Sequence, residues 1–494
     1  MEQLSSTDSA FIYAEDRKLP MHVTTATIYD PSTAPQGKVR LKEIMNLFER
    51  AVYNVPMFRQ RLVEVPLGLD QPYWVEDPDF DIEYHVRHVA LPKPGDWRQF
   101  YIQVARMTTR PLDRSRPLWE VYVVEGLNNL EGVPAGSFAV VMKLHHASLK
   151  GEALRSLFGS LNTRTPEAPT EQPQFQRALQ REILRGNLPL LINAAQNNFA
   201  RSLKASRVMR DAYLSLRRIR KGQALGDLRE PAPVPPTRFN GAPSPHRSVT
   251  SYSMLFEDAQ AARSTLEGAT VNDLAMTIIG GAMRRYLINQ SELPDDSVVG
   301  QVLMGIKEGE PLNPDQRRLS PVNVPLRSDI EDDLERFYAV HDEAEHARRY
   351  LKARGVEIGE EVAASMNPLA ARSVLKVQES LGQLSLLKHF YPASPNTTIS
   401  NMPGPLDTVY FCGARIVTSF GFGPCMPEIG LVHTVTSAAG QLTIGVNACR
   451  VMLPNPEFYQ SCLQESWQQL QQLLVAQRQR PQRARSKATP AASA

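Results

Sequence analysis

Two adjacent histidines, His145 and His146, follow the apolar stretch 136–144 and are the residues best suited to chemistry in this sequence. An imidazole changes its protonation state near neutral pH, so a histidine at the edge of a site can act as a general base. The stretch 136–144 is almost continuously apolar up to Lys143, as expected of a strand buried on both faces. Because side chains alternate along a strand, the two rings are expected to point in opposite directions. At most one ring can then face a reacting group, and the other packs or holds the backbone. The alternative is that the pair is purely structural.

Other chemistries have weaker support. Ser148 follows the histidines but lacks the G-x-S-x-G context of a hydrolase nucleophile. The four cysteines form no C-x-x-C pair and have no histidines at zinc-ligand spacing, so the sequence predicts no metal site. They do not resemble a disulfide framework either, which favours a reducing cytoplasm. These cysteines are Cys412, Cys425, Cys449 and Cys462.

The composition is that of a soluble globular protein. The chain has 494 residues, of which 42% are hydrophobic and 22% charged, enough for two or three ordinary domains. A net charge of +3 does not indicate nucleic acid, and no nucleic-acid motif or aromatic platform is apparent. The N-terminus lacks a basic start followed by an apolar core, and no window of about 18 apolar residues occurs. We therefore expect a cytoplasmic protein without a signal peptide, a membrane-spanning helix or a nucleic-acid partner.

Residue patterns predict both strands and helices. The runs 21–29 and 119–127 are rich in β-branched and aromatic residues and predict strands. Apolar residues at helical spacing predict helices over 41–52 and 270–287, and another after the histidines. Further elements are expected toward the C-terminus: strands at 396–405 and 414–420, a hairpin over 431–449 turning at Ala-Ala-Gly-Gln, and a helix beginning at Asn455-Pro456.

Two proline-rich stretches, 163–174 and 229–247, separate two mixed regions of the chain. The sequence therefore predicts an α/β protein with two lobes and a crossover between them. The expected parts are an N-terminal lobe over 1–165, a helical basic segment with a proline-rich linker over 166–247, a C-terminal lobe over 248–480 and a disordered basic tail over 481–494.

The segment 177–221 is rich in both basic and apolar residues and poor in acidic ones. The residues GNLP at 186–189 are expected to break it, with a short helix before and a longer one after. Such a composition suits the surface of an anionic bilayer or a lipid droplet. The alternative is a helix packed on the protein with a solvated basic face. The basic residues are Arg177, Arg181, Arg185, Arg201, Lys204, Arg207, Arg210, Arg217, Arg218, Arg220 and Lys221, and the apolar ones Leu188, Leu190, Leu191, Ile192, Phe199, Leu203, Val208, Leu214 and Leu216.

Several longer strings occur in the order found in one known family. Two of them, P-L-D-R-S-R-P-L-W-E and S-N-M-P-G-P, are long enough to be specific. From residue 4 to about 460 the chain resembles the bacterial wax ester synthase/diacylglycerol acyltransferase family. The matching strings are PMHVTTATIYDP (20–31), RPLDRSRPLWEVYVVEGL (110–127), KLHHASLKG (143–151), ATVNDLAMTIIGGAMRRYL (269–287), SNMPGPLDTVYFCGARI (400–416), GLVHTVTSAAGQLTIGV (430–446) and, more weakly, VNVPLRSD (322–329).

The resemblance implies a fold related to chloramphenicol acetyltransferase and peptide-synthetase condensation domains, in which two α/β lobes enclose a tunnel. A motif H-H-x-x-x-D-G lies at the lobe interface, and its second histidine, here His146, is implied to be the general base. It takes the proton from an alcohol as the oxygen attacks an acyl-CoA thioester. The implied partners are acyl-CoA as co-substrate and diacylglycerol or a fatty alcohol, and the implied products are triacylglycerol or wax esters. No other cofactor is implied. Such insoluble products favour peripheral association with the inner membrane or lipid droplets.

The other matches imply supporting roles. His145 and Gly151 belong to the motif around His146. Asn272 and Asp273 match an N-D pair near the tunnel, where an asparagine can stabilise oxyanion charge. Because the pair opens an apolar helix, an N-terminal cap is the alternative.

The family's P-L-W segment, thought to line the acyl-binding region, is represented by Pro117, Leu118 and Trp119. Ordinary strand core is the alternative for these three residues. His22, in the string P-M-H-V, is interpreted as structural.

The chain departs from the family motif at Lys150, which replaces the aspartate. In related folds that aspartate pairs with an arginine and anchors the histidine loop. Lys150 must therefore point to solvent, or a rebuilt network must supply another carboxylate from Glu152, Asp329 or Glu331. A nearby cation would also lower the pKa of His146. Two further functions stay open: a weak or inactive homologue that binds acyl chains or lipid surfaces, and acyl transfer from a carrier protein.

Overall fold

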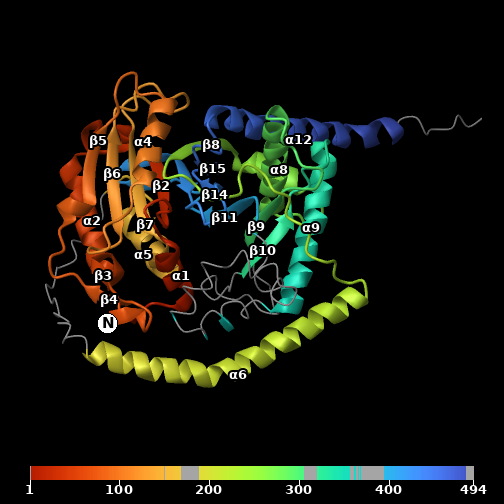
Figure 1. Ribbon diagram of the computed structural model, residues 1–494. Helices are drawn as coiled ribbons and strands as arrows, with labels where there is room; N and C mark the ends of the chain where they lie inside the picture. The colour runs from red at the N-terminus through yellow and green to blue at the C-terminus, as the bar shows by residue number, and fades with distance from the viewer. Residues whose placement is uncertain are drawn as a thin grey trace, which may run out of the picture.

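The computed structural model describes residues 2–149, 151–167, 188–304, 320–355 and 394–485, together with four single residues between 356 and 393. Two six-stranded sheets form the centres of two lobes (Figure 1). The order of strands is β12-β13-β2-β7-β6-β5 in the N-terminal sheet and β10-β9-β11-β14-β15-β8 in the C-terminal sheet. A small sheet of order β1-β4-β3 lies in the N-terminal lobe.

The N-terminal lobe is built on β7, whose residues are all buried, as the continuous apolar run predicted. It lies between β2 and β6, and the pairing with β2 places His22 opposite His145. One face of the sheet packs against α2 and α5, and the other against α4. The elements are β1 (Glu2–Gln3), α1 (Ser6–Ala14), β2 (His22–Asp30), α2 (Leu41–Asn54), β3 (Gln60–Val63), β4 (Tyr73–Glu76), α3 (Ile82–His85), β5 (Val86–Ala90), α4 (Trp97–Thr109), β6 (Trp119–Glu125), β7 (Phe138–His145) and α5 (Gly151–Leu161), with 3-10 turns η1 (Pro31–Thr33), η2 (Pro35–Gly37), η3 (Pro56–Arg59), η4 (Pro66–Gly68) and η5 (His146–Ser148).

The C-terminal lobe packs three long helices, α8, α9 and α12, against one face of its sheet (Figure 1). The predicted hairpin is present, because β14 and β15 are antiparallel and turn between Ala438 and Gln441. The elements are β8 (Arg247–Leu255), α7 (Phe256–Arg263), α8 (Val271–Asn289), β9 (Val299–Met304), β10 (Ser320–Pro325), α9 (Asp333–Arg354), β11 (Thr397–Pro403), β14 (Leu431–Ala438), β15 (Gln441–Cys449) and α12 (Pro456–Arg485).

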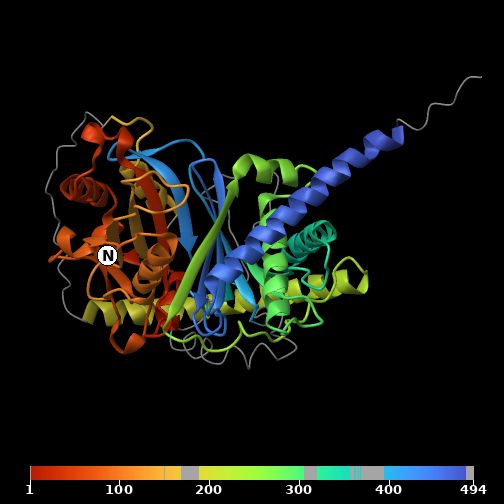
Figure 2. The ribbon, with the colours of Figure 1, turned by 90° about the horizontal axis from the view of Figure 1, so that it is seen from above.

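The predicted lobe boundaries need two corrections. The strands β12 (Tyr410–Phe411) and β13 (Ala414–Phe422), assigned to the C-terminal lobe, belong to the N-terminal sheet, because β13 pairs with β2 along almost its whole length. The second correction concerns the tail, expected to be disordered from residue 481. The helix α12 continues to Arg485 and extends beyond the lobe (Figure 2).

The two lobes meet closely where β13 crosses β14 and β15. Gly423 N–H donates to Thr434 Oγ1 at 3.0 Å, and Asn447 Nδ2 donates to the Gly423 carbonyl at 2.7 Å. A Cβ atom at Gly445 would overlap the Gly421 carbonyl oxygen, so this approach requires glycine. At another contact, Tyr101 of α4 hydrogen-bonds Ser251 of β8 at 2.8 Å.

The helix α6 (Leu188–Ala224) runs beneath both lobes (Figure 1). It begins inside the GNLP string, as expected, while the shorter helix predicted before it lies outside the described residues. Leu190 and Ala194 pack against the small sheet, and Arg201 forms an ion pair with buried Asp70 at 2.7 Å. At the other end Ile219 packs against Tyr350 of α9. The crossover therefore attaches to both lobes.

Candidate active site

The histidine loop is the turn η5, which follows β7 directly. His146 begins this turn, so the strand alternation that predicted opposite ring directions stops at His145. Both rings contact α1 or the C-cap residue that follows it, His146 at Phe11 and His145 at Glu15. The two environments differ, since His145 is fully buried and His146 is half-buried.

His145 holds the backbone of the loop. Its Nδ1 accepts a hydrogen bond from Ala147 N–H at 3.1 Å, so the proton of the neutral ring lies on Nε2. Nε2 is 3.6 Å from Glu15 Oε1, and Arg114 forms an ion pair with Glu15 Oε2 at 2.7 Å. Burial alone would raise the pKa of Glu15, but His145 and Arg114 outweigh it and lower the pKa to about 2. Glu15 is therefore an anion at neutral pH.

Glu15 also reaches the second histidine through the backbone. Met21 N–H donates to Glu15 Oε1 at 3.1 Å, and His146 N–H donates to the Met21 carbonyl at 2.8 Å. The ring of His146 stacks on Phe11, with centroids 3.7 Å apart. One carboxylate and one aromatic ring thus fix the histidine loop against α1.

His146 itself is suited to accept a proton. Its burial, and secondly the proximity of His145, lower the pKa of His146 to about 4. The imidazole is consequently neutral at pH 7. Within the described part of the chain no other side chain forms a hydrogen bond with this ring, and the hydrogen bond that acts on its pKa is to the backbone of His146 itself.

Residues from the C-terminal half complete the surroundings of the loop. Cys425 and Met426, which follow β13, pack with Met21 and with Phe11, the residue that stacks on His146. Arg247 at the start of β8 donates to the Lys18 carbonyl at 2.6 Å. The histidine loop therefore lies where the two lobes meet.

The predicted P-L-W residues lie inside the N-terminal lobe. All three are buried, and Trp119 stacks on His85 at 4.3 Å and donates to the Phe58 carbonyl at 2.8 Å. Leu118 packs with Ala147 of the histidine loop, and its carbonyl accepts from His145 N–H at 3.0 Å. These contacts are those of strand core next to the loop, and a role of Pro117, Leu118 and Trp119 in acyl binding stays a prediction.

Asn272 and Asp273 occupy the start of α8. Asp273 forms a capping box with Thr270 and contacts His341 Nδ1 at 2.9 Å, so it has the contacts of the predicted helix cap. Asn272 accepts a hydrogen bond from Asn401 of β11 at 3.0 Å, which joins two of the family strings. No described contact joins either residue to His146. Among the other predicted residues, Gly151 begins α5, and His22 is buried with Nε2 2.8 Å from the Thr108 carbonyl, as the structural interpretation expected.

The carboxylate next to the histidine loop is Glu15, which the sequence analysis did not single out. Of the carboxylates proposed there, Asp329 pairs with Arg327 at 2.8 Å in the C-terminal lobe, and the side chain of Glu152 lies outside the described residues, as does Lys150. The S-S-T-D string, in which Ser5 caps α1, was a readable helix signal. The contact between Glu15 and His145, however, depends on the pairing of β2 with β7, which no local pattern reveals.

No group of His, Cys, Asp or Glu within the described ranges is arranged to hold a metal ion. None of the helices described there has the length and hydropathy needed to cross a membrane. The expectation that the protein needs neither a metal nor another cofactor stays a prediction.

The two-lobed α/β fold with histidines at the lobe interface places the protein in the structural class of the chloramphenicol acetyltransferase-like and condensation domains. The first condensation domain of the calcium-dependent antibiotic synthetase, solved with a substrate analogue, is similar with a TM-score of 0.56 and 15% identity, covering 96% of both chains. The wax ester synthase/diacylglycerol acyltransferase from Marinobacter aquaeolei VT8 is similar with a TM-score of 0.65 and 24% identity, covering 96% of this chain and 100% of the other. These likenesses establish the fold.

Sequence comparison establishes the family. The profile of the wax ester synthase/diacylglycerol acyltransferase catalytic domain matches residues 4–275, and that of the WS/DGAT C-terminal domain matches residues 318–471. A Mycobacterium tuberculosis H37Rv protein, whose name gives a provisional assignment as a diacylglycerol O-acyltransferase, is 30% identical over 467 residues, covering 92% of this chain and 94% of the relative. A similarly named Mycobacterium bovis protein is 29% identical over 482 residues, covering 96% and 99%. The chain belongs to the wax ester synthase/diacylglycerol acyltransferase family.

Proposed function

We propose that the protein transfers an acyl group from acyl-CoA to the hydroxyl of a diacylglycerol or a long-chain alcohol, with His146 as general base. The observation that carries the proposal is the environment of His146. The ring is neutral, desolvated, held by Phe11 and placed between the lobes. Membership of the family supplies the reaction class.

The reaction follows from these groups without an acyl-enzyme. The alcohol oxygen attacks the thioester carbonyl while its proton passes to a ring nitrogen of His146. The C–O bond forms, the C–S bond breaks, and the proton leaves with the thiolate to give free CoA and the ester. A base whose pKa is about 4 cannot deprotonate an alcohol in advance, so proton transfer and attack must occur together.

The direct test measures CoA release by the purified full chain with palmitoyl-CoA and either diacylglycerol or hexadecanol. We expect His146→Ala to lower the rate by about 10²–10⁴-fold, the usual loss when a general base is removed. The matched control is His88→Ala, which removes a half-exposed histidine on β5 that contacts Glu125. Equal rates for His146→Ala and the parent protein would exclude His146 as the base. A folded parent protein that releases no CoA would instead favour the alternative of an inactive homologue that binds acyl chains.

We further propose that α6 is the surface that contacts anionic lipid. Its outward face exposes large apolar side chains, among them Phe199, Leu203 and Met209, which are 69%, 65% and 74% exposed. The helix also carries eight Lys or Arg residues against one acidic residue, Asp211. Apolar residues that the described part of the chain leaves exposed, beside clustered positive charge, match the interior and the head groups of an anionic lipid surface.

A further inference from the structure

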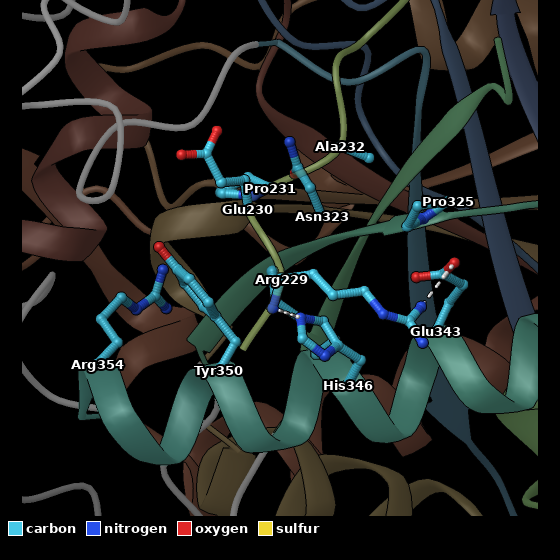
Figure 3. Close-up of a pocket in the computed structure, with 12 residues that line it drawn as sticks. Arg229, Glu230, Pro231, Ala232, Asn323, Pro325, Glu343, His346, Tyr350 and Arg354 are labelled. Atoms are coloured by element: carbon cyan, nitrogen blue, oxygen red, sulfur yellow. Dashed lines mark hydrogen bonds and ion pairs between the residues drawn. The ribbon is translucent and has the colours of Figure 1, made fainter. Parts of the chain in front are cut away.

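A pocket of about 170 Å³ lies in the C-terminal lobe (Figure 3), and none of its lining residues belongs to the elements that carry the histidine loop. Its walls come from the linker after α6, from β10 and from α9. Much of the lining is apolar or aliphatic. These lining residues are Pro231, Ala232, Val322, Pro325 and Ala347.

A buried cation, Arg354 in the last turn of α9, also lines the pocket (Figure 3). Arg354 is only 6% exposed, and its Nη2 donates to Ser320 Oγ at 2.6 Å and to the Pro321 carbonyl at 3.1 Å. Its Nε is buried without a hydrogen-bond partner. Across the described ranges no carboxylate forms an ion pair with this guanidinium. A buried arginine without a counter-charge is unfavourable unless an anion joins it.

The neighbouring charges in the pocket already have partners. Arg229 forms ion pairs with Asp342 at 3.0 Å and with Glu343 at 3.6 Å. His346 Nε2 accepts the Arg229 backbone N–H at 3.2 Å, so this nitrogen carries no proton. Among the described residues, the charge in this pocket that lacks an ion-pair partner is therefore the single positive charge of Arg354.

We propose that this pocket binds a monocarboxylate with a short apolar tail, in the chemical class of fatty acids. A carboxylate matches one guanidinium in charge and in its planar, two-oxygen geometry. A phosphate dianion fits less well, because its second negative charge finds no further cation to pair with and increases the repulsion from Glu230 and Glu343, which line the same pocket. The aliphatic walls accommodate the tail. The ligand lies apart from His146, so the proposal does not depend on acyl transfer.

The test is calorimetric titration of the purified full chain with sodium octanoate, octanol and inorganic phosphate, without acyl-CoA. We expect octanoate to bind the parent protein. Octanol, which lacks the carboxylate, and phosphate, which lacks the apolar tail, should each bind at least about tenfold more weakly. Arg354→Gln should weaken octanoate binding at least about tenfold. The control Arg349→Gln, which changes an exposed arginine of the same helix, should leave binding unchanged.

A second variant keeps the test informative if Arg354→Gln does not fold, since Arg354 also joins α9 to β10. Ala232→Trp places a large ring at the pocket from the exposed linker, leaves Arg354 in place and should also abolish the Arg354-dependent binding. Octanoate binding that survives both variants belongs to another site and overturns the proposal. Phosphate binding tighter than octanoate binding overturns it as well, and so does a parent protein that binds no octanoate. If the parent protein binds no octanoate, or if binding survives both variants, Arg354 serves only to join α9 to β10.

Discussion

At the residue scale, the surroundings of His146 decide which kind of base it can be. An exposed histidine would have a pKa near 6.5, the usual value for this side chain, and would be partly protonated in mildly acidic solution. Burial of His146 lowers its pKa to about 4, so the ring stays unprotonated in mildly acidic solution and remains available as a base. The same burial makes the ring a weaker base, so the site depends on accurate placement of the attacking hydroxyl.

This pKa predicts the acid limb of the pH–rate profile. We expect kcat/KM to be nearly constant from pH 7 to about 5 and to fall with a midpoint near pH 4, the lowered pKa of His146. Between about pH 6.5 and pH 4, His146 is protonated in the unfolded chain but not in the folded protein. The free energy of unfolding therefore also decreases as the pH falls through that window. Circular dichroism at each pH separates the two effects. An acid limb centred near pH 6.5 in a fully folded protein would contradict the assignment.

Glu15 is predicted to position the histidine loop rather than to touch substrate. Glu15→Gln removes the charge that faces His145 and Arg114, and we expect a lower kcat with little change in KM. The stability loss should be about 1–3 kcal/mol, less than for a fully buried pair because the Arg114 side chain is 37% exposed. Steady-state kinetics and thermal unfolding measure both effects.

The matched control for Glu15 is Glu64→Gln. Glu64 contacts the same arginine at 3.8 Å but is 53% exposed, so its removal should change neither kcat nor stability appreciably. If Glu15→Gln raised KM and left kcat unchanged, Glu15 would act in binding instead.

The sequence identified the histidines because their types and their place after an apolar run are local properties. It did not identify Glu15 or Phe11, since their contacts arise only when β2 and β7 bring residues about 130 positions apart together. For Asn272 and Asp273 the local alternative, a helix cap, was readable from the sequence and is what Asp273 forms.

At the scale of elements, α6 has one face held by the protein and another that nothing in the described structure covers. The held face uses Leu190, Ala194 and Ile219, whereas Phe199, Leu203 and Tyr213 are exposed. In the sequence alone, the apolar residues of this segment form one set. In the structure they fall into a packed group and an exposed group, because the helix packs on the small sheet at one end and on α9 at the other.

We expect the protein to sediment with anionic phosphatidylglycerol-containing liposomes at low salt and to dissociate as the salt concentration rises. Replacing Arg217, Arg218 and Arg220 by Gln should weaken this binding at least about tenfold, since each basic residue near a membrane surface contributes about 1 kcal/mol. Replacing Phe199 and Leu203 by Ser should weaken binding at all salt concentrations, because it removes apolar insertion.

A matched set of substitutions tests whether the effect is local. Lys38, Arg40 and Lys42 are exposed basic residues at or just before the start of α2, and changing all three to Gln removes the same charge from another part of the surface. If both triple variants lost liposome binding equally, binding would depend on net charge alone, and α6 would not be the contact surface.

At the scale of the whole molecule, the close crossing of β13 with β14 and β15 keeps the lobes in one arrangement. Most strands and helices were predicted from local patterns, but the exchange of β13 between lobes was not, because its sequence alternates like that of any half-buried strand. Which sheet a strand joins depends on partners distant in the chain.

The crossing predicts a large effect of one methyl group. Gly445→Ala places a Cβ against the Gly421 carbonyl, so the strands must separate slightly, and we expect a loss of about 1–3 kcal/mol in the free energy of unfolding. Gly159→Ala in α5 is the control: nothing lies near its added Cβ, and it should be neutral or stabilising by about 0.5–1 kcal/mol. Chemical denaturation measures both. Equal stabilities for the two variants would show that the crossing tolerates separation.

The pairing of β13 with β2 of the N-terminal sheet also affects folding during synthesis. During synthesis the strand β2 emerges early, but its partner on one side is not complete until residue 422 has left the ribosome. Until then the nascent N-terminal half presents an unpaired strand edge, the feature most prone to pairing with other chains. A fragment ending at residue 165 would keep that open edge permanently. The two family domains that divide the sequence therefore share one sheet, and β2 keeps an open edge until β13 has been made.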